Sequence, residues 1–162
     1  NLFSKLILLD SIIVLPPERA AAMKSSRPSS RFAVFSEDLE DAISRFRLMP
    51  PQPCAKDFVL RNVAKNSYKQ TEEGWTLKAD PLIPKTYEYN DLHDIFMKAQ
   101  IDIEVVYGGS SQLYTKEVLD YMIYVGNLDP AKVHKLDGAM HHLFLDMPEE
   151  FIELINKILK DD

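Results

Sequence analysis

The sequence predicts an α/β fold in which helices cover a parallel β-sheet. Residues 6–9 form a continuous aliphatic run, which is typical of a parallel strand that is buried on both faces. Residues 101–107 form a second apolar, β-branched run that ends in two glycines, and helical spacing follows at residues 115–125. The order along the chain is strand, helical insertion, helix, strand, helix, strand and helix, and such alternation favours a parallel sheet.

The region between residues 16 and 90 differs in character from the rest of the chain. It holds most of the 10 prolines, and its apolar positions follow helical spacing. We therefore predict an inserted helical subdomain. The predicted organisation is a core strand at residues 1–15, the helical insertion at 16–90 and the rest of the core at 91–162.

Within the insertion, a helix is expected to begin with Ser36 as its N-cap and to stop before Pro50. A second helix is expected at residues 58–68, where the apolar face is loose. Residues 74–78 alternate apolar and polar side chains, which predicts a short extended segment. After the insertion, Asp91 is expected to cap the next helix.

The last third of the chain is expected to add a short strand, a loop and a long helix. The strand lies around residues 132–136 and the loop at residues 137–145. Pro148 in the first turn predicts a helix that runs to Lys160. Its inward face is expected to contain Phe151, Ile152, Ile155 and Leu159.

Composition and charge exclude several classes of function. The chain has 162 residues, of which 46% are hydrophobic and 27% charged, as is ordinary for a folded domain. The net charge of −6, with scattered basic residues, argues against a nucleic-acid partner. No apolar run approaches the roughly 20 residues that span a bilayer, so no membrane partner is expected. The single cysteine, Cys54, fits a reducing compartment, and the cytoplasm is the expected location.

The most informative stretch is GAMHHLFLDMPEEF at residues 138–151, between the last predicted strand and the last predicted helix. It resembles the histidine loop of α/β-hydrolases, in which a small-residue turn precedes the catalytic histidine and an acidic-x-Pro step starts the final helix. That register selects His141, with His142 beside it. A general base has to stand on a short exposed loop at the carboxyl edge of the sheet, and this loop supplies that position. A metal site built from these histidines lacks a recognised ligand spacing, so no metal is predicted.

Residues 103–113, IEVVYGGSSQL, resemble the penultimate-strand segment of the same family. Many members carry the acid of the catalytic triad a few residues after the glycine, where this chain has Ser110 and Ser111. Some branches, including haloalkane dehalogenase-like enzymes, place the acid at the tip of the strand that follows the nucleophile helix, and LILLDSI resembles that segment. The resemblance therefore implies that Asp10 is the triad acid, which would stabilise the imidazolium form of His141. A turn or cap role is the alternative for Asp10.

Three segments of the predicted insertion resemble the cap of a bacterial α/β-hydrolase subgroup: RPSSRF at 27–32, RFRLMPPQP at 45–53 and GWTLKADP at 74–81. With these segments, the resemblance covers nearly the whole chain. A cap lies over the catalytic edge and lines the substrate pocket. The candidate substrate contacts are therefore Phe46, Met49, Trp75 and, next to the catalytic histidine, His142. Packing in the small core of the cap itself is the alternative for the three cap residues.

A nucleophile is missing from the sequence. No G-x-S-x-G motif, and no other small-x-nucleophile-x-small turn between a strand and a helix, is found, and residues 108–112 have the wrong frame. The chain also enters a core strand directly, so we expect it to begin in mid-domain. The resemblance then implies that the nucleophile and the oxyanion-hole amides lie in a missing N-terminal half, which is either an adjoining segment or a partner chain.

The sequence thus leads to a partial α/β-hydrolase fold with an inserted helical cap, whose complete form cleaves an ester, lactone or related bond of a small molecule. Ser-His-Asp chemistry requires no cofactor. A dehalogenase-like displacement and a non-enzymatic small-molecule binding module stay open, the second because the usual acid is lost at Ser111. The chain alone is expected to be inactive and, since half a parallel sheet leaves an unpaired edge, to aggregate or to associate with another chain.

Overall fold

The computed structural model describes residues 3–25, 34–80, 90 and 92–160. The chain folds as two compact units, of which unit 1 comprises Asn1–Met23 with Tyr89–Asp162 and unit 2 comprises Lys24–Glu88. The expected boundary after residue 15 differs from the observed one after Met23. The reason is that Ala20, in helix α1 (Pro17–Ser25), is buried in the same apolar cluster as Leu8 and Val14.

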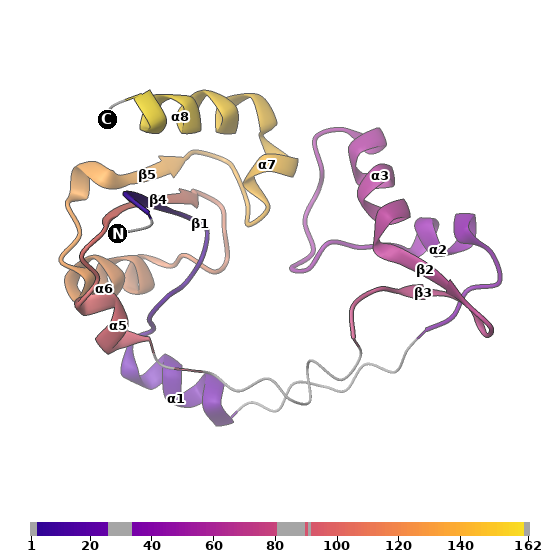
Figure 1. Ribbon diagram of the computed structural model, residues 1–162, viewed down its shortest axis with the longest axis horizontal. Coiled ribbons are helices and arrows are strands. Elements are labelled where there is room, and N and C mark those ends of the chain that lie inside the picture. Colours follow the sequence, from indigo (N-terminus) through magenta and orange to yellow (C-terminus); the bar gives the residue numbers. More distant parts are fainter. Residues whose placement is uncertain (1–2, 26–33, 81–89, 91, 161–162) are drawn as a thin grey trace. The chain divides into compact units, whose positions relative to one another are not determined.

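Unit 1 is built on a three-stranded parallel sheet, which confirms the predicted α/β class (Figure 1). Its strands are β1 (Lys5–Leu9), β4 (Asp102–Gly108) and β5 (Val133–Leu136), in the order β1-β4-β5. The central strand β4 pairs Val106 with Leu9 on one side, and Gly108 with Leu136 on the other. The carboxyl ends of all three strands therefore lie at one edge of the sheet.

Helices cover both faces of this sheet. They are α1, α5 (His93–Met97), α6 (Lys116–Gly126), α7 (Leu143–Asp146) and α8 (Pro148–Lys160), and the 3₁₀ turn η1 (Pro130–Lys132) lies between α6 and β5 in the chain. Neighbouring residues of β4 enter different cores, because successive strand side chains point to opposite faces. Val105 packs with Met122 of α6, and Val106 packs with Ile158 of α8. Figure 1 shows α6 and α8 on opposite sides of the strands.

Two expectations for the last third were wrong. The segment expected to be a continuous loop contains helix α7, whose first residue, Leu143, is almost fully buried and holds this turn against the sheet. In α8, Ile152 and Leu159 were expected inside, but they are 57% and 53% exposed. The inward stripe is instead Phe151, Leu154, Ile155 and Ile158, with the spacing of one helical face.

Unit 2 contains α2 (Leu39–Arg45), α3 (Asp57–Ser67) and an antiparallel hairpin of β2 (Tyr68–Thr71) and β3 (Gly74–Leu77). Helix α2 is capped by Asp38, whose Oδ1 accepts a hydrogen bond of 2.8 Å from the amide of Asp41. The expectation that Ser36 caps this helix was therefore wrong. Ser36 is buried in a backbone bridge with Trp75, with N–O distances of 2.9 and 2.8 Å, and this pairing extends the hairpin.

Two sequence features fall outside the described residues. One is Asp91, the expected helix cap, and the other is the segment at residues 27–32 that resembles a hydrolase cap. Helix α5 itself begins at His93, with Leu92 at its N-cap. In the part of the chain that the structure describes, no helix has the length and apolarity needed to cross a membrane.

Candidate functional site

The site is built at the carboxyl edge of the sheet of unit 1, and its first component is Asp10. This residue directly follows β1, and its amide continues the β ladder with a bond of 2.8 Å to the carbonyl oxygen of Val106. Its φ angle is +45°, a left-handed conformation that aspartate tolerates better than most residues. The chain thus turns sharply at the strand tip, and the Asp10 side chain is fully buried.

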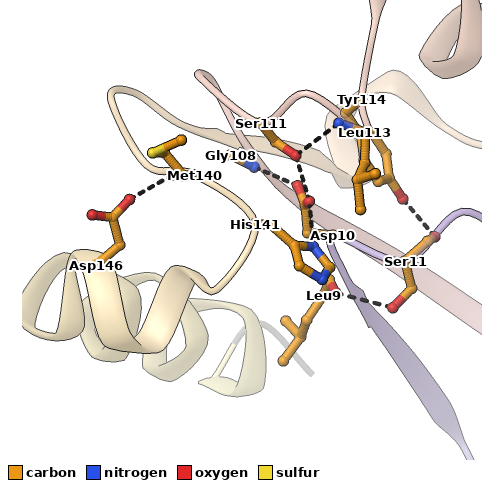
Figure 2. A network of polar contacts seen from close by, with 10 residues as sticks. All are labelled: Leu9, Asp10, Ser11, Gly108, Ser111, Leu113, Tyr114, Met140, His141 and Asp146. Carbon is orange, nitrogen blue, oxygen red and sulfur yellow. Dashed lines mark hydrogen bonds and ion pairs between the residues drawn. The ribbon is translucent and has the colours of Figure 1, made fainter. Parts of the chain in front are cut away.

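The carboxylate of Asp10 accepts three hydrogen bonds (Figure 2). Its Oδ1 accepts one of 2.9 Å from the amide of Gly108, at the end of β4. Its Oδ2 accepts one of 2.6 Å from the hydroxyl of Ser111 and lies 2.9 Å from Nδ1 of His141. Burying a carboxylate is costly unless such donors replace water, and this set of donors replaces it.

At Gly108 the end of β4 and the histidine loop approach each other closely. A Cβ atom on this residue would lie 2.4 Å from the carbonyl oxygen of Ala139 and 2.6 Å from that of Met140. Only glycine leaves room for these two backbone oxygens. A hydrogen bond two residues later also joins these segments, because the amide of Ser110 donates a bond of 2.9 Å to the Ala139 carbonyl oxygen.

The loop that carries His141 is held from its other side by Asp146. Oδ2 of Asp146, at the end of α7, accepts a hydrogen bond of 2.6 Å from the amide of Met140. The loop begins with a left-handed turn at Gly138, whose φ angle is +82°. The acidic-x-Pro step of the sequence therefore has a local role, since its acid anchors the residue before His141.

The contact with Asp10 defines the protonation pattern of the His141 ring. Because a carboxylate only accepts hydrogen bonds, Nδ1 of His141 carries the proton that points at Asp10. In the neutral ring, Nε2 is then an acceptor, and it has no hydrogen-bond partner among the residues described. The side chain is 26% exposed. The ring thus offers a basic nitrogen to a group that arrives from outside the sheet.

His142 lies beside this ring, with the two ring centroids 4.7 Å apart. It precedes α7 as the N-cap residue, and it is half-buried. Of the four candidate substrate contacts, His142 is the one that belongs to unit 1.

Tyr114 supports the turn after Asp10. Its hydroxyl donates a hydrogen bond of 2.6 Å to the carbonyl oxygen of Ser11, and its ring stacks on Tyr107 at a centroid distance of 5.5 Å. Burial, and secondly the charge of Asp10, raise the pKa of Tyr114 well above its ordinary value. The hydroxyl therefore remains a donor at neutral pH and fixes the backbone next to the buried carboxylate.

The other three candidate substrate contacts lie in unit 2. Phe46 follows α2 and meets Tyr68 edge to face at a centroid distance of 6.3 Å. Met49 is 53% exposed, and Trp75 lies in β3, paired with Ser36. Phe46 and Trp75 thus take part in the packing of their own unit, and a substrate contact remains a prediction for all three.

The sequence predicted two residues of this site, and the structure adds others. The sequence indicated Asp10 and His141, and the structure brings them into contact. Ser111 was read as the place of a lost acid, but it donates directly to Asp10. The glycine pair at 108–109 was a visible signal of close backbone approach, whereas the role of Tyr114 had no local signal.

No group of three or more metal-ligating side chains is found in the portion of the chain that the structure describes.

Comparison with known proteins supports the fold. No family model matches the sequence, and a search of curated proteins finds no match. Among solved structures, E-2-(acetamidomethylene)succinate hydrolase is similar with a TM-score of 0.75 and 18% identity, over 97% of this chain and 57% of that chain. An esterase from Mycobacterium tuberculosis is similar with a TM-score of 0.70 and 18% identity, over 96% and 52% of the two chains. The peroxisomal α/β-hydrolase of Saccharomyces cerevisiae is similar with a TM-score of 0.68 and 14% identity, over 99% and 48%.

These similarities define the class of structure. The chain has a partial α/β-hydrolase fold, as the sequence resemblance predicted. It spans about half the length of the solved structures that it matches. Those structures include a hydrolase and an esterase, and at this level of identity the likeness describes the fold.

Proposed function

We propose that this chain supplies the histidine and the acid of a Ser-His-Asp hydrolase that cleaves an ester, lactone or related bond of a small molecule. The observation that carries the proposal is the contact of 2.9 Å between Nδ1 of His141 and Oδ2 of Asp10, at the carboxyl edge of a parallel sheet. A buried carboxylate behind one imidazole nitrogen, with the other nitrogen unoccupied, is the arrangement of a general base. The α/β-hydrolase fold supports the same chemistry.

The proposed reaction proceeds in two stages, which are formation of an acyl-enzyme and its hydrolysis by water. Nε2 of His141 takes the proton of the nucleophilic hydroxyl as its oxygen bonds to the substrate carbonyl carbon, and Asp10 stabilises the imidazolium. The imidazolium then gives its proton to the leaving alcohol as the bond to that alcohol breaks, which leaves an acyl-enzyme. Water is activated in the same way, and its attack releases the acid and restores the hydroxyl. No cofactor takes part.

The nucleophile itself is proposed to lie outside these 162 residues. The sequence contains no nucleophile elbow, and the chain covers only 57% and 52% of two of the solved structures that it matches. An adjoining segment or a partner chain would supply the nucleophile and the oxyanion-hole amides. We use the term assembled protein for this chain together with that segment. In it, His142, Phe46, Met49 and Trp75 are the proposed substrate contacts.

The proposal is tested by hydrolysis of short p-nitrophenyl esters by the assembled protein. We expect His141→Ala to lower kcat at least about ten-thousandfold, because it removes the general base through which Asp10 also acts. His93→Ala, on helix α5 and outside the site, is the matched control and should retain the wild-type rate. Equal rates for wild type and His141→Ala would end the hydrolase proposal and favour a binding module. The chain alone is expected to show no turnover, and turnover by it would contradict an external nucleophile.

The identity of the residue at the nucleophile elbow distinguishes the proposed serine hydrolase from a dehalogenase-like enzyme. An aspartate there would make the enzyme dehalogenase-like, with a carboxylate as the nucleophile. Asp10 and His141 would serve either reaction in the same geometry, so the sequence of the nucleophile segment decides between them. We expect a serine.

A further inference from the structure

Ser111 and His141 share one oxygen atom of the buried acid (Figure 2). Ser111 Oγ lies 2.6 Å from Oδ2 of Asp10, and His141 Nδ1 lies 2.9 Å from the same atom. The serine contact is thus the shorter of the two. Ser111 stands on the loop after β4, whereas His141 stands on the loop after β5. Two separate loops therefore converge on one carboxylate oxygen.

The direction of the Ser111 hydroxyl is set by a second bond. The amide of Leu113 donates a hydrogen bond of 3.2 Å to Ser111 Oγ. A hydroxyl has one proton to donate, so accepting from an amide leaves that proton for a different partner. The partner within reach is Oδ2 of Asp10. Ser111 is thereby oriented as a donor to the acid.

The two oxygens of Asp10 are fixed by different donors. Gly108 N holds Oδ1 at 2.9 Å, and Ser111 Oγ holds Oδ2 at 2.6 Å. With both oxygens held by donors outside the imidazole, rotation of the carboxylate about its bond to Cβ would break a hydrogen bond, which favours the position of Oδ2 against the His141 ring. With Gly108 alone, that rotation is restrained at one oxygen only. Without Ser111, Oδ2 is held by His141 alone, so the carboxylate that orients the ring is itself held at this oxygen only by the ring.

We propose that Ser111 is a positioning residue for the proposed reaction, which holds the Asp10 carboxylate so that His141 presents Nε2 to the nucleophile. The inference rests on the proposed function. The inference also goes beyond the proposed function, because it gives a role to the position at which, by the sequence resemblance, many α/β-hydrolases carry the triad acid. A role limited to folding the loop would require only the bond from Leu113, which does not involve the site.

The test compares four variants of the assembled protein: Ser111→Ala, Ser111→Thr, Ser111→Cys and the neighbouring Ser110→Ala. Loss of a hydrogen bond to a charged group should lower kcat of Ser111→Ala for a p-nitrophenyl ester about tenfold to a hundredfold, with KM changed less than about twofold. Ser111→Thr keeps the hydroxyl and should restore most of the rate. Ser110 is exposed, and Ser110→Ala should match wild type.

A second readout does not depend on turnover. The proton between Nδ1 of His141 and Oδ2 of Asp10 should give a low-field NMR resonance in wild type, Ser110→Ala and Ser111→Thr. In Ser111→Ala this resonance should move or disappear. If wild type shows no turnover, the proposed function fails, and the resonance still tests the positioning role of Ser111.

The inference is overturned if Ser111→Ala equals Ser110→Ala in both the rate and the resonance. An equal fall in Ser111→Ala and Ser111→Thr, with the resonance intact in both, would also overturn it, because a folding role would then suffice. If Ser111→Ala does not fold, Ser111→Cys replaces it, since a thiol fills the space but donates weakly. That variant should then show the loss of rate.

Discussion

Nδ1 of His141 lies 2.9 Å from Oδ2 of Asp10, although 131 positions separate the two residues in the sequence. Strand β4 lies between β1, which Asp10 directly follows, and β5, whose following loop contains His141, since the sheet order is β1-β4-β5. The last residue of β4, Gly108, donates to Asp10 and also makes room for the loop before His141. The pair is therefore formed across the end of the central strand.

Gly108 should tolerate a side chain less well than its neighbour Gly109. In Gly108→Ala the Cβ would collide with two backbone oxygens, which should lower the free energy of unfolding by about 1–3 kcal/mol. In Gly109→Ala the nearest atom is the flexible end of Lys135, at 2.8 Å, so the effect should be smaller. Urea unfolding of the assembled protein measures the difference. Equal unfolding midpoints would contradict the close approach at Gly108.

Asp146 should affect the rate through the loop of His141. Asp146→Ala removes the acceptor of the Met140 amide, so kcat for a p-nitrophenyl ester should fall about tenfold. Asp146→Asn retains an acceptor oxygen and should lose less activity. Asp137→Ala is the control, because Asp137 is exposed and pairs with Lys135 at the surface. A rate of Asp146→Ala equal to that of this control would argue against the anchor.

Tyr114 should make the fold less stable at alkaline pH. Its pKa is raised from the ordinary value of 10.0, so above about pH 10 the unfolded chain releases the proton while the folded chain keeps it. The free energy of unfolding then falls as pH rises, and the full contribution is present only below that pH. In Tyr114→Phe this part of the pH dependence should vanish.

The measurement for Tyr114 is urea unfolding at about pH 8 and at about pH 11. The decrease between the two pH values should be smaller in Tyr114→Phe than in wild type. Tyr124→Phe serves as the control, because Tyr124 is 82% exposed. It should follow the wild type, and the account of Tyr114 fails if both variants behave alike.

An acid at position 111 should replace part of the function of Asp10. Because Ser111 Oγ already lies 2.6 Å from Oδ2 of Asp10, a carboxylate at position 111 reaches the same region. We expect Asp10→Asn combined with Ser111→Asp to turn over at least about tenfold faster than Asp10→Asn alone. Ser110→Asp in the same background is the control. No gain over this control would show that position 111 cannot supply the charge.

The core of unit 1 could be predicted because its signals are local. The aliphatic run of β1, the β-branched run of β4 and the proline at the start of α8 each lie within the element that they define. The pairing of Asp10 with His141 was reached through resemblance to a family, since no spacing in the sequence places the end of β1 beside the loop after β5.

The remaining details depend on contacts between distant residues. Serine is a favoured N-cap residue, but Ser36 pairs with Trp75 as part of the hairpin, and Asp38 caps the helix instead. Ile152 and Leu159 are as apolar as Ile158, and the placement of α8 on the sheet decides which of them is inside. The hydrogen bonds of Ser111 and Tyr114 likewise require the folded sheet edge.

The most direct test of the account is a double-mutant cycle of Asp10→Asn and His141→Ala on ester hydrolysis by the assembled protein. If Asp10 acts through His141, Asp10→Asn should lower kcat about a thousandfold to ten-thousandfold when His141 is present. In the His141→Ala background, the same substitution should cause almost no further loss. Equal losses in both backgrounds would contradict the account, because the two residues would then act independently.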